Sequence, residues 1–244
     1  MTWVESFYSK QSLWSGCYEG PIGKVDTLRA ELITSLGTNQ RLLELGCGGG
    51  QTAVACALQG HKVHALELVN RLADHARKLA SIECAPIEVE TCDFYEWKSK
   101  HLFDVVCYWD GFGIGTDIDQ LHLLSRISNW LRPGGYALID IYNPFYAYST
   151  IGAEHRLANV TRQYDFDSLE CRWIDTWWLS SNPFEKIVQT LRCYTLADIR
   201  LLLSSSELHL NKEQPYSENG HGSSDSAEVN TKRNQISYTI ILRK

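Results

Sequence analysis

The sequence has few of the features that would assign it to a membrane, to nucleic acid or to secretion. No apolar run among its 244 residues approaches the roughly 20 residues needed to cross a bilayer. Lys and Arg number 23 against 29 Asp and Glu, and a net charge of −6 argues against a surface dedicated to phosphate backbones. The first residues have no basic stretch followed by an apolar one, so no secretory signal is expected. We therefore expect a cytoplasmic protein without nucleic-acid or membrane partners.

Metal-binding and redox motifs are also missing. The eight cysteines include no C-x-x-C pair, the spacing typical of zinc sites and dithiol redox centres. Several lie in apolar runs such as "DVVCYW", where a reduced cysteine behaves as a small hydrophobic residue. No set of carboxylates suggests a magnesium site, so no metal ion is expected.

What the chain does contain is a regular alternation of strands and helices over residues 22–142. Helices are predicted at 22–36, 51–59, 70–80 and 117–131, and strands at 41–45, 62–68, 87–92, 103–109 and 134–142. A turn is predicted at Pro133-Gly134-Gly135. Because each strand is almost wholly apolar, the pattern indicates an α/β fold, a parallel sheet with helices on both faces.

The alternation stops after residue 142. Residues 157–194 are predicted to form three extended segments, separated by turns at 167–168 and 181–183. Thr195 has the spacing of a helix cap, and strands at 207–213 and 235–244 flank a polar loop at 216–234.

The stretch "RLLELGCGGG" at 41–50 joins a strand to a loop with four glycines in five positions. No lysine follows these glycines, which excludes a Walker phosphate loop, and Gln51 replaces the third glycine of the dinucleotide fingerprint, which weakens that reading without excluding it. Glu44, just before the turn, would repel a phosphate but attract a cation. The ammonium and sulfonium of S-adenosylmethionine match that charge, and Gly46 and Gly48 permit close backbone approach.

Two more carboxylates follow successive strands. Glu67 can accept hydrogen bonds from both hydroxyls of an adenosine ribose, and Asp93 can receive the adenine amino group while Phe94 or Tyr95 packs on the ring. Each acid alone could be a solvated strand-end residue. Ligands of open α/β sheets bind outside the carboxyl ends of strands, so the three acids together favour an adenosine-containing ligand.

With these motifs the sequence resembles the class I S-adenosylmethionine-dependent methyltransferases. "LLELGCGGG", "HALEL" and "CDF" correspond to their first three motifs, "FDVVCYWDGFGIG" to the fourth, and "LRPGGYALID" to the segment before the fifth strand. The resemblance implies a Rossmann-like, seven-stranded, mostly parallel sheet with a reversed final strand at its edge. It also implies a helical arm at 1–40 over the donor, a donor-binding core at 41–149 and 195–244, and an inserted antiparallel β lid at 150–194.

The resemblance also implies roles for particular residues. Glu44, Gly46 and Gly48 would lie at the methionine end, Glu67 at the ribose, and Asp93 and Phe94 at the adenine. The aromatic N-terminus resembles a segment that closes over the donor in many relatives, although it could be a docked arm. Further expected donor-site residues are Tyr8, Trp14, Cys47, Leu68 and Trp109.

The acceptor side is less defined by the sequence. Members of the family that methylate nucleobases or glutamine carry Asn/Asp-Pro-Pro-Tyr after the fourth strand, and its absence here disfavours those acceptors. Candidate catalytic residues are His155, Asp110 and Tyr142; His155 could equally be a linker histidine and Asp110 a loop cap. Arginines at 162, 172 and 192 could converge on a carboxylate or simply be solvated. Expected acceptor contacts are Trp109, Phe112, Arg172, Trp177 and Arg192.

These expectations amount to a methyltransferase, monomeric or homodimeric. Its acceptor would be a nitrogen or oxygen, a carboxylate included, of a small organic or peptide-like molecule. A nicotinamide oxidoreductase and a non-catalytic donor-binding regulator are the alternatives.

Overall fold

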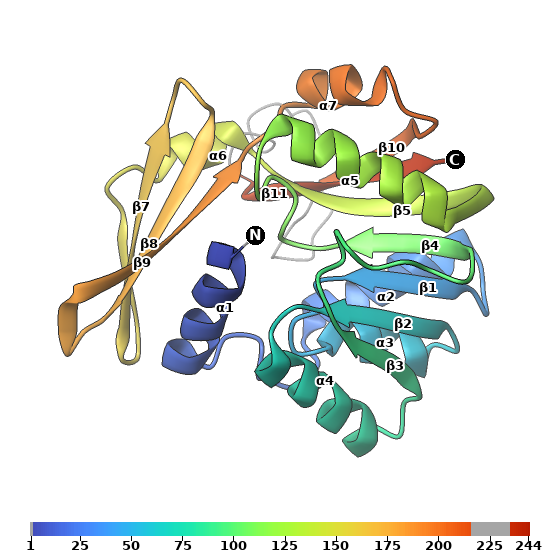
Figure 1. Ribbon diagram of the computed structural model, residues 1–244, viewed down its shortest axis with the longest axis horizontal. Coiled ribbons are helices and arrows are strands. Elements are labelled where there is room, and N and C mark those ends of the chain that lie inside the picture. The colour runs from blue at the N-terminus through green and yellow to red at the C-terminus, as the bar shows by residue number, and fades with distance from the viewer. Residues whose placement is uncertain (1, 216–234) are drawn as a thin grey trace, which may run out of the picture. The chain divides into compact units, whose positions relative to one another are not determined.

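The computed structural model describes residues 2–215 and 235–244 (Figure 1). The predicted loop at 216–234 lies outside the described residues. The chain divides into two compact units. The first comprises Met1–Trp109, Asn129–Ala137 and Lys244, and the second comprises Asp110–Ser128 and Leu138–Arg243.

A seven-stranded sheet has the order β10-β11-β5-β4-β1-β2-β3. Its strands are β1 (Arg41–Leu45), β2 (Lys62–Glu67), β3 (Ile87–Thr91), β4 (Phe103–Tyr108), β5 (Leu131–Tyr142), β10 (His209–Pro215) and β11 (Ser237–Arg243). β1 pairs in parallel with β2 and β4, and β2 with β3. The predicted α/β class and mostly parallel Rossmann-like sheet are confirmed.

The reversed final strand is also confirmed, but its place differs from the expectation. β11 pairs antiparallel with β10. It also runs against β5, since Gly134 and Gly135 bond Lys244 at one end while Asn143 bonds Ile236 at the other. β11 therefore lies inside the sheet, between β10 and β5, and β10 forms the edge.

The predicted turn at Pro133-Gly134-Gly135 is wrong, because β5 begins at Leu131 and continues through it. The amide of Gly134 donates to the carbonyl of Lys244 at 2.9 Å, and the Lys244 amide donates back to Gly135 at 3.0 Å. Gly134 has a φ of 78°, so the residue that suggested a turn instead bends a paired strand.

The helices of the first unit follow from their sequences. α1 (Thr2–Ser15) is the expected N-terminal helix, and α2 (Lys24–Leu36) begins after Gly23, whose amide donates to Asp26. α3 (Gln51–Leu58) buries Thr52 to Ala57 without a polar face, because its small side chains pack on α2 and against the sheet. α4 (Asn70–Ile82) is strongly amphipathic and packs on β2 and β3.

The second unit holds α5 (Asp117–Trp130) up to Ser128 and a separate antiparallel sheet of order β6-β7-β8-β9. The three predicted extended segments correspond to β7 (Val160–Asp167), β8 (Arg172–Leu179) and β9 (Asn182–Arg192). The sequence missed β6 (Glu154–Leu157) and the short helix α6 (Pro144–Ser149). α7 (Leu196–Leu203) begins with the predicted capping box of Thr195 and Asp198. Among the described residues, no helix is long and apolar enough to span a membrane.

Two glycines of the 46–50 loop are required by close packing. A Cβ on Gly49 would lie 1.6 Å from the carbonyl oxygen of Tyr18, and one on Gly50 would lie 2.5 Å from the Cβ of Ala76. Gln51 donates to the carbonyl of Tyr18 at 2.8 Å and to that of Gly20 at 2.9 Å. The segment after α1 is thus held directly against the glycine loop.

We expect Gly49→Ala to lower the free energy of unfolding by about 1–3 kcal/mol, the usual cost of overpacking. Gly20→Ala is the matched control, because nothing lies within 4 Å of its Cβ, and its effect should stay within about 0.5 kcal/mol. Urea denaturation of both variants measures the difference. Equal midpoints would contradict the close contact at Gly49.

Candidate functional site

The loop after β1 has a backbone that only glycine adopts readily. Gly46 and Gly48 have φ angles of 59° and 56°, in the left-handed region. A Cβ on either would have ordinary contacts of 3.5–3.6 Å, so conformation requires these glycines and lack of space does not. The loop is fixed to β2 by the Cys47 amide, which donates to Leu66 at 2.9 Å.

Glu67, at the end of β2, supports this loop through its carboxylate. Its Oε2 accepts from the Gly48 amide at 2.7 Å, and its Oε1 accepts from the Val69 amide at 2.8 Å. The residue is only 6% exposed, and burial raises its pKa, an effect that these backbone donors oppose. Since each carboxylate oxygen has two lone pairs, both retain capacity for another donor. Leu68, also expected at the donor, follows directly in the chain.

Glu44, in β1, is a buried acid with a strongly shifted pKa. It is 2% exposed, and no hydrogen-bond donor within the described residues reaches its Oε2. Burial raises its pKa to about 8; the charge of Arg29 opposes the shift, and Asp26 and Glu67 add to it. A cation placed at this carboxylate would reverse most of that penalty.

Arg29 and Trp109 contribute a further part of this region. The Arg29 guanidinium lies 4.7 Å from the centre of the Trp109 ring, a cation–π contact. Trp109 is 7% exposed, and its Nε1 has no acceptor in the part of the chain that the structure describes. The sequence analysis missed Arg29 and Asp26, because nothing in the pattern of α2 indicates which helix positions approach β1.

At the end of β3, Asp93 and Phe94 lie in an aromatic turn. The Asp93 carboxylate accepts from the Tyr95 amide at 2.8 Å, and its carbonyl accepts from Trp97. The Phe94 ring lies 4.9 Å from Tyr95 and 5.3 Å from Tyr108, centre to centre. Tyr108, at the end of β4, was not predicted as a site residue; its register opposite Leu45 of β1 places it there.

The aromatic residues of α1 are only partly buried. Tyr8 and Trp14 are half-buried, and the Tyr8 ring packs edge-on against the buried Phe7. Tyr8 also acts electrostatically on Tyr108, whose pKa is raised chiefly by burial. α1 thus brings Tyr8 near the end of β4. The ring of Trp14, by contrast, is covered by the ammonium group of Lys10.

Residues 22–210 of the sequence match a family model described as a methyltransferase domain. This chain belongs to the class I S-adenosylmethionine-dependent methyltransferase family. The family's methyl donor is S-adenosylmethionine.

Individual relatives are distant. Protein-L-isoaspartate O-methyltransferase 2 of Syntrophobacter fumaroxidans is 27% identical over 135 residues, 52% of this chain and 51% of the relative. The chain spans about half the length of the curated relatives it matches.

Solved structures share the fold along most of the chain. The CcbJ methyltransferase from Streptomyces caelestis superposes with a TM-score of 0.77 at 17% identity, covering 97% of both chains. S-adenosylmethionine-bound CalS10, an amino pentose methyltransferase from Micromonospora echinaspora, gives 0.63 at 16% identity and 92% coverage of both.

The residues of this chain are chemically suited to the family's donor. The buried Glu44 oxygen, which no donor of the described residues reaches, would be stabilised by a positive charge such as S-adenosylmethionine carries. Glu67 offers acceptor capacity for hydroxyl groups. The individual donor-site assignments remain predictions.

The three candidate catalytic residues all lie in the second unit but in different surroundings. Tyr142 packs on Trp173 at 5.3 Å, and the exposed His155 packs on Tyr164 at 5.4 Å. Both therefore border the aromatic cluster between α6 and the four-stranded sheet. Asp110 begins the loop after β4 with a φ of 56° and is exposed. Their catalytic roles stay predictions.

The predicted acceptor residues are buried or already engaged. Phe112 is fully buried, with its ring 5.5 Å from Tyr194. Trp177 is 1% exposed, and the guanidinium of Arg162 lies 4.5 Å from its ring while pairing with Asp175.

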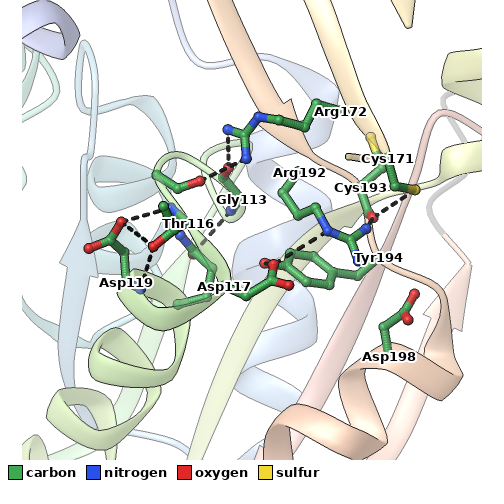
Figure 2. Close-up of polar contacts among 12 residues, drawn as sticks. Gly113, Thr116, Asp117, Asp119, Cys171, Arg172, Arg192, Cys193, Tyr194 and Asp198 are labelled. Atoms are coloured by element: carbon green, nitrogen blue, oxygen red, sulfur yellow. Dashed lines mark hydrogen bonds and ion pairs between the residues drawn. The ribbon is translucent and has the colours of Figure 1, made fainter. Parts of the chain in front are cut away.

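Arg172 donates to the carbonyl of Gly115, whereas Arg192 donates to the carbonyl of Cys193 and pairs with Asp117 (Figure 2). The three lid arginines thus have protein partners, and a role in holding an acceptor carboxylate remains a prediction. Within the described ranges, no group of His, Cys, Asp or Glu is arranged to hold a metal ion.

The raised pKa of the buried Glu44 predicts that the stability of the fold depends on pH. The pKa of Glu44 is about 8 in the folded chain, against an ordinary value of 4.5. Between these two pH values the carboxyl group is protonated in the folded chain and ionised in the unfolded chain. The free energy of unfolding should fall as pH rises through this window. Glu44→Gln should flatten that part of a pH series of denaturation midpoints. An unchanged slope in this variant would contradict the assignment.

Proposed function

We propose that this methyltransferase transfers a methyl group from S-adenosylmethionine to a nitrogen or oxygen of a small organic or peptide-like acceptor. The observation that carries the proposal is the buried, unpartnered carboxylate oxygen of Glu44 beside a glycine loop held by Glu67. A buried acid of this kind can release its proton and pair with a cationic ligand, whereas the pyrophosphate of a dinucleotide would offer it no positive charge. The family match likewise favours the methyltransferase over the nicotinamide enzyme.

The residues of the first unit would bind and orient the donor. Glu44 would face the positive methionine end, Glu67 would accept the ribose hydroxyls, and Asp93 and Phe94 would hold the adenine. The donor supplies an electrophilic methyl group on a sulfonium. The helical arm at 1–40 would cover the donor and keep water from it.

The acceptor would be recognised by the lid at 150–194 and the loop after β4. Asp110 is proposed to orient an amine or hydroxyl, with His155 or Tyr142 as the alternative proton acceptors. Holding a nucleophile in line with the methyl group lowers the barrier greatly even without a strong base. A small acceptor is supported by relatives whose names describe an amino pentose methyltransferase and a glycopeptide N-methyltransferase.

Donor binding can be measured without the acceptor. By calorimetry, S-adenosylmethionine should bind far more tightly than NAD. At pH 7 it should also release much of a proton, because the cation lowers the pKa of Glu44 from about 8. Adenosine, which lacks the charged tail, is the matched ligand control and should release little. Glu44→Gln should remove the proton release.

Glu67→Ala should weaken S-adenosylmethionine binding by about 1.5–3 kcal/mol, the value of hydrogen bonds to a charged group. Tighter binding of NAD, with Glu67→Ala affecting NAD alone, would overturn the proposed donor.

The transfer itself is tested by incubating the chain with S-adenosylmethionine and fractionated metabolite extract. We expect a methylated product, about 14 Da heavier, in a small-molecule or peptide fraction, together with S-adenosylhomocysteine. Asp110→Ala should reduce its rate while donor binding is unchanged. Donor binding without turnover in any fraction would indicate a non-catalytic regulator.

A further inference from the structure

Several backbone groups of the loop Gly111–Thr116, between β4 and α5, are hydrogen-bonded to side chains outside the loop. The loop follows Asp110, which is proposed to orient the acceptor, and it contains the buried Phe112. Its glycines Gly113 and Gly115 have φ angles of 108° and 91°, so the loop adopts a conformation unlike regular structure. A loop of this kind needs outside contacts to keep one conformation.

Arg172, the first residue of β8, provides several of these contacts (Figure 2). Its Nη1 donates to the carbonyl of Gly115 at 2.8 Å, and its Nη2 donates to that of Gly113 at 3.3 Å. Two more bonds attach the same guanidinium to Thr190 of β9, at its hydroxyl and its carbonyl, each 3.2 Å long. The side chain therefore bridges the lid sheet and the loop.

The opposite side of the loop is fixed by α5 and by the end of β9. The buried Gln120 accepts from the Gly113 amide at 3.1 Å and donates to the carbonyl of Ile114. The Arg192 amide donates to the Gly113 carbonyl at 2.9 Å. A Cβ on Gly113 would lie 2.2 Å from the Arg192 carbonyl oxygen, so the two backbones are in direct contact.

The chemistry of Arg172 favours holding the loop over binding an anion. A guanidinium has five N–H donors in a rigid plane, and here four hydrogen bonds reach neutral oxygens from two segments. An acceptor carboxylate would have to displace the carbonyls of Gly113 or Gly115 and release the loop. Lysine, with a point charge on a flexible stem, could not reach all these oxygens together.

We propose that Arg172 is a positioning residue for the proposed methyl transfer. It links the lid to the loop Gly111–Thr116 and so fixes the backbone next to Asp110 and around Phe112. This inference rests on the proposed function for its kinetic consequence. The structural part, that Arg172 holds the loop, can be tested on its own.

The test of the loop uses one amide signal in the full chain. Phe112-Gly113 is the only Phe-Gly pair in the sequence, so labelling with carbonyl-13C phenylalanine and 15N glycine isolates the Gly113 amide in an NMR spectrum. Arg172→Ala should shift this signal and accelerate its exchange with solvent about tenfold or more, as expected for losing a hydrogen bond to a charged group. Arg172→Lys should give an intermediate effect.

Arg156→Ala is the matched control, because Arg156 lies on β6 of the same sheet and its side chain is 82% exposed. Its Gly113 signal should equal that of the unaltered chain. Gln120→Leu, which removes the anchor on the α5 side, should shift the signal as well. A Gly113 signal that Arg172→Ala and Arg172→Lys leave unmoved would overturn the proposal.

The kinetic test uses S-adenosylmethionine and the extract fraction that the chain methylates. Arg172→Lys should lower kcat about tenfold with a smaller change in acceptor KM and unchanged donor binding. A raised KM with unchanged kcat would instead make Arg172 an acceptor ligand and overturn the positioning role. If the unaltered chain methylates no fraction, the proposed function fails, and the Gly113 signal still decides whether Arg172 holds the loop.

Discussion

The glycine loop after β1 depends on two buried carboxylates, Glu44 and Glu67, at the ends of neighbouring strands. Glu67 offsets its burial with backbone amides, and these bonds join the glycine loop to the residues after β2. Within residues 2–215 and 235–244, the Oε2 of Glu44 has no such donor, so its carboxyl group favours either a proton or a cation. Three features of the fold meet at these two acids: the glycine loop, the paired ends of β1 and β2, and the start of α3.

The strands and the donor loop could be predicted because their signals are local. An apolar run such as "RLLEL" forms a buried strand in any parallel sheet, and glycines after a strand mark a turn. β6 and α6 were missed for the opposite reason: the four residues of β6 are all exposed, and six residues are too few to show a helical period. Pro133-Gly134-Gly135 misled because its pairing partner, Lys244, lies far along the sequence.

The site shows the same division. Glu44 and Glu67 could be identified because an acid at a strand end stands out. Arg29 and Tyr108 could not, since their approach depends on how α2 packs and how β4 aligns with β1. Arg162, Arg172 and Arg192 were recognised by position, but the backbone carbonyls that Arg172 and Arg192 bind leave no mark in the sequence. A side chain's type shows what it can bind, and only packing shows what it has already bound.

Arg172 and Arg192 both connect the four-stranded sheet to the segment after β4, and the two connections respond differently to ionic strength. Arg172 bonds uncharged oxygens from a half-buried position, so dissolved ions compete with it only weakly. Arg192 pairs at 3.3 Å with Asp117, whose side chain is 54% exposed, and such a pair is screened as salt is added. Concentrated salt should therefore loosen the first turn of α5 while leaving the glycine backbone before it in place.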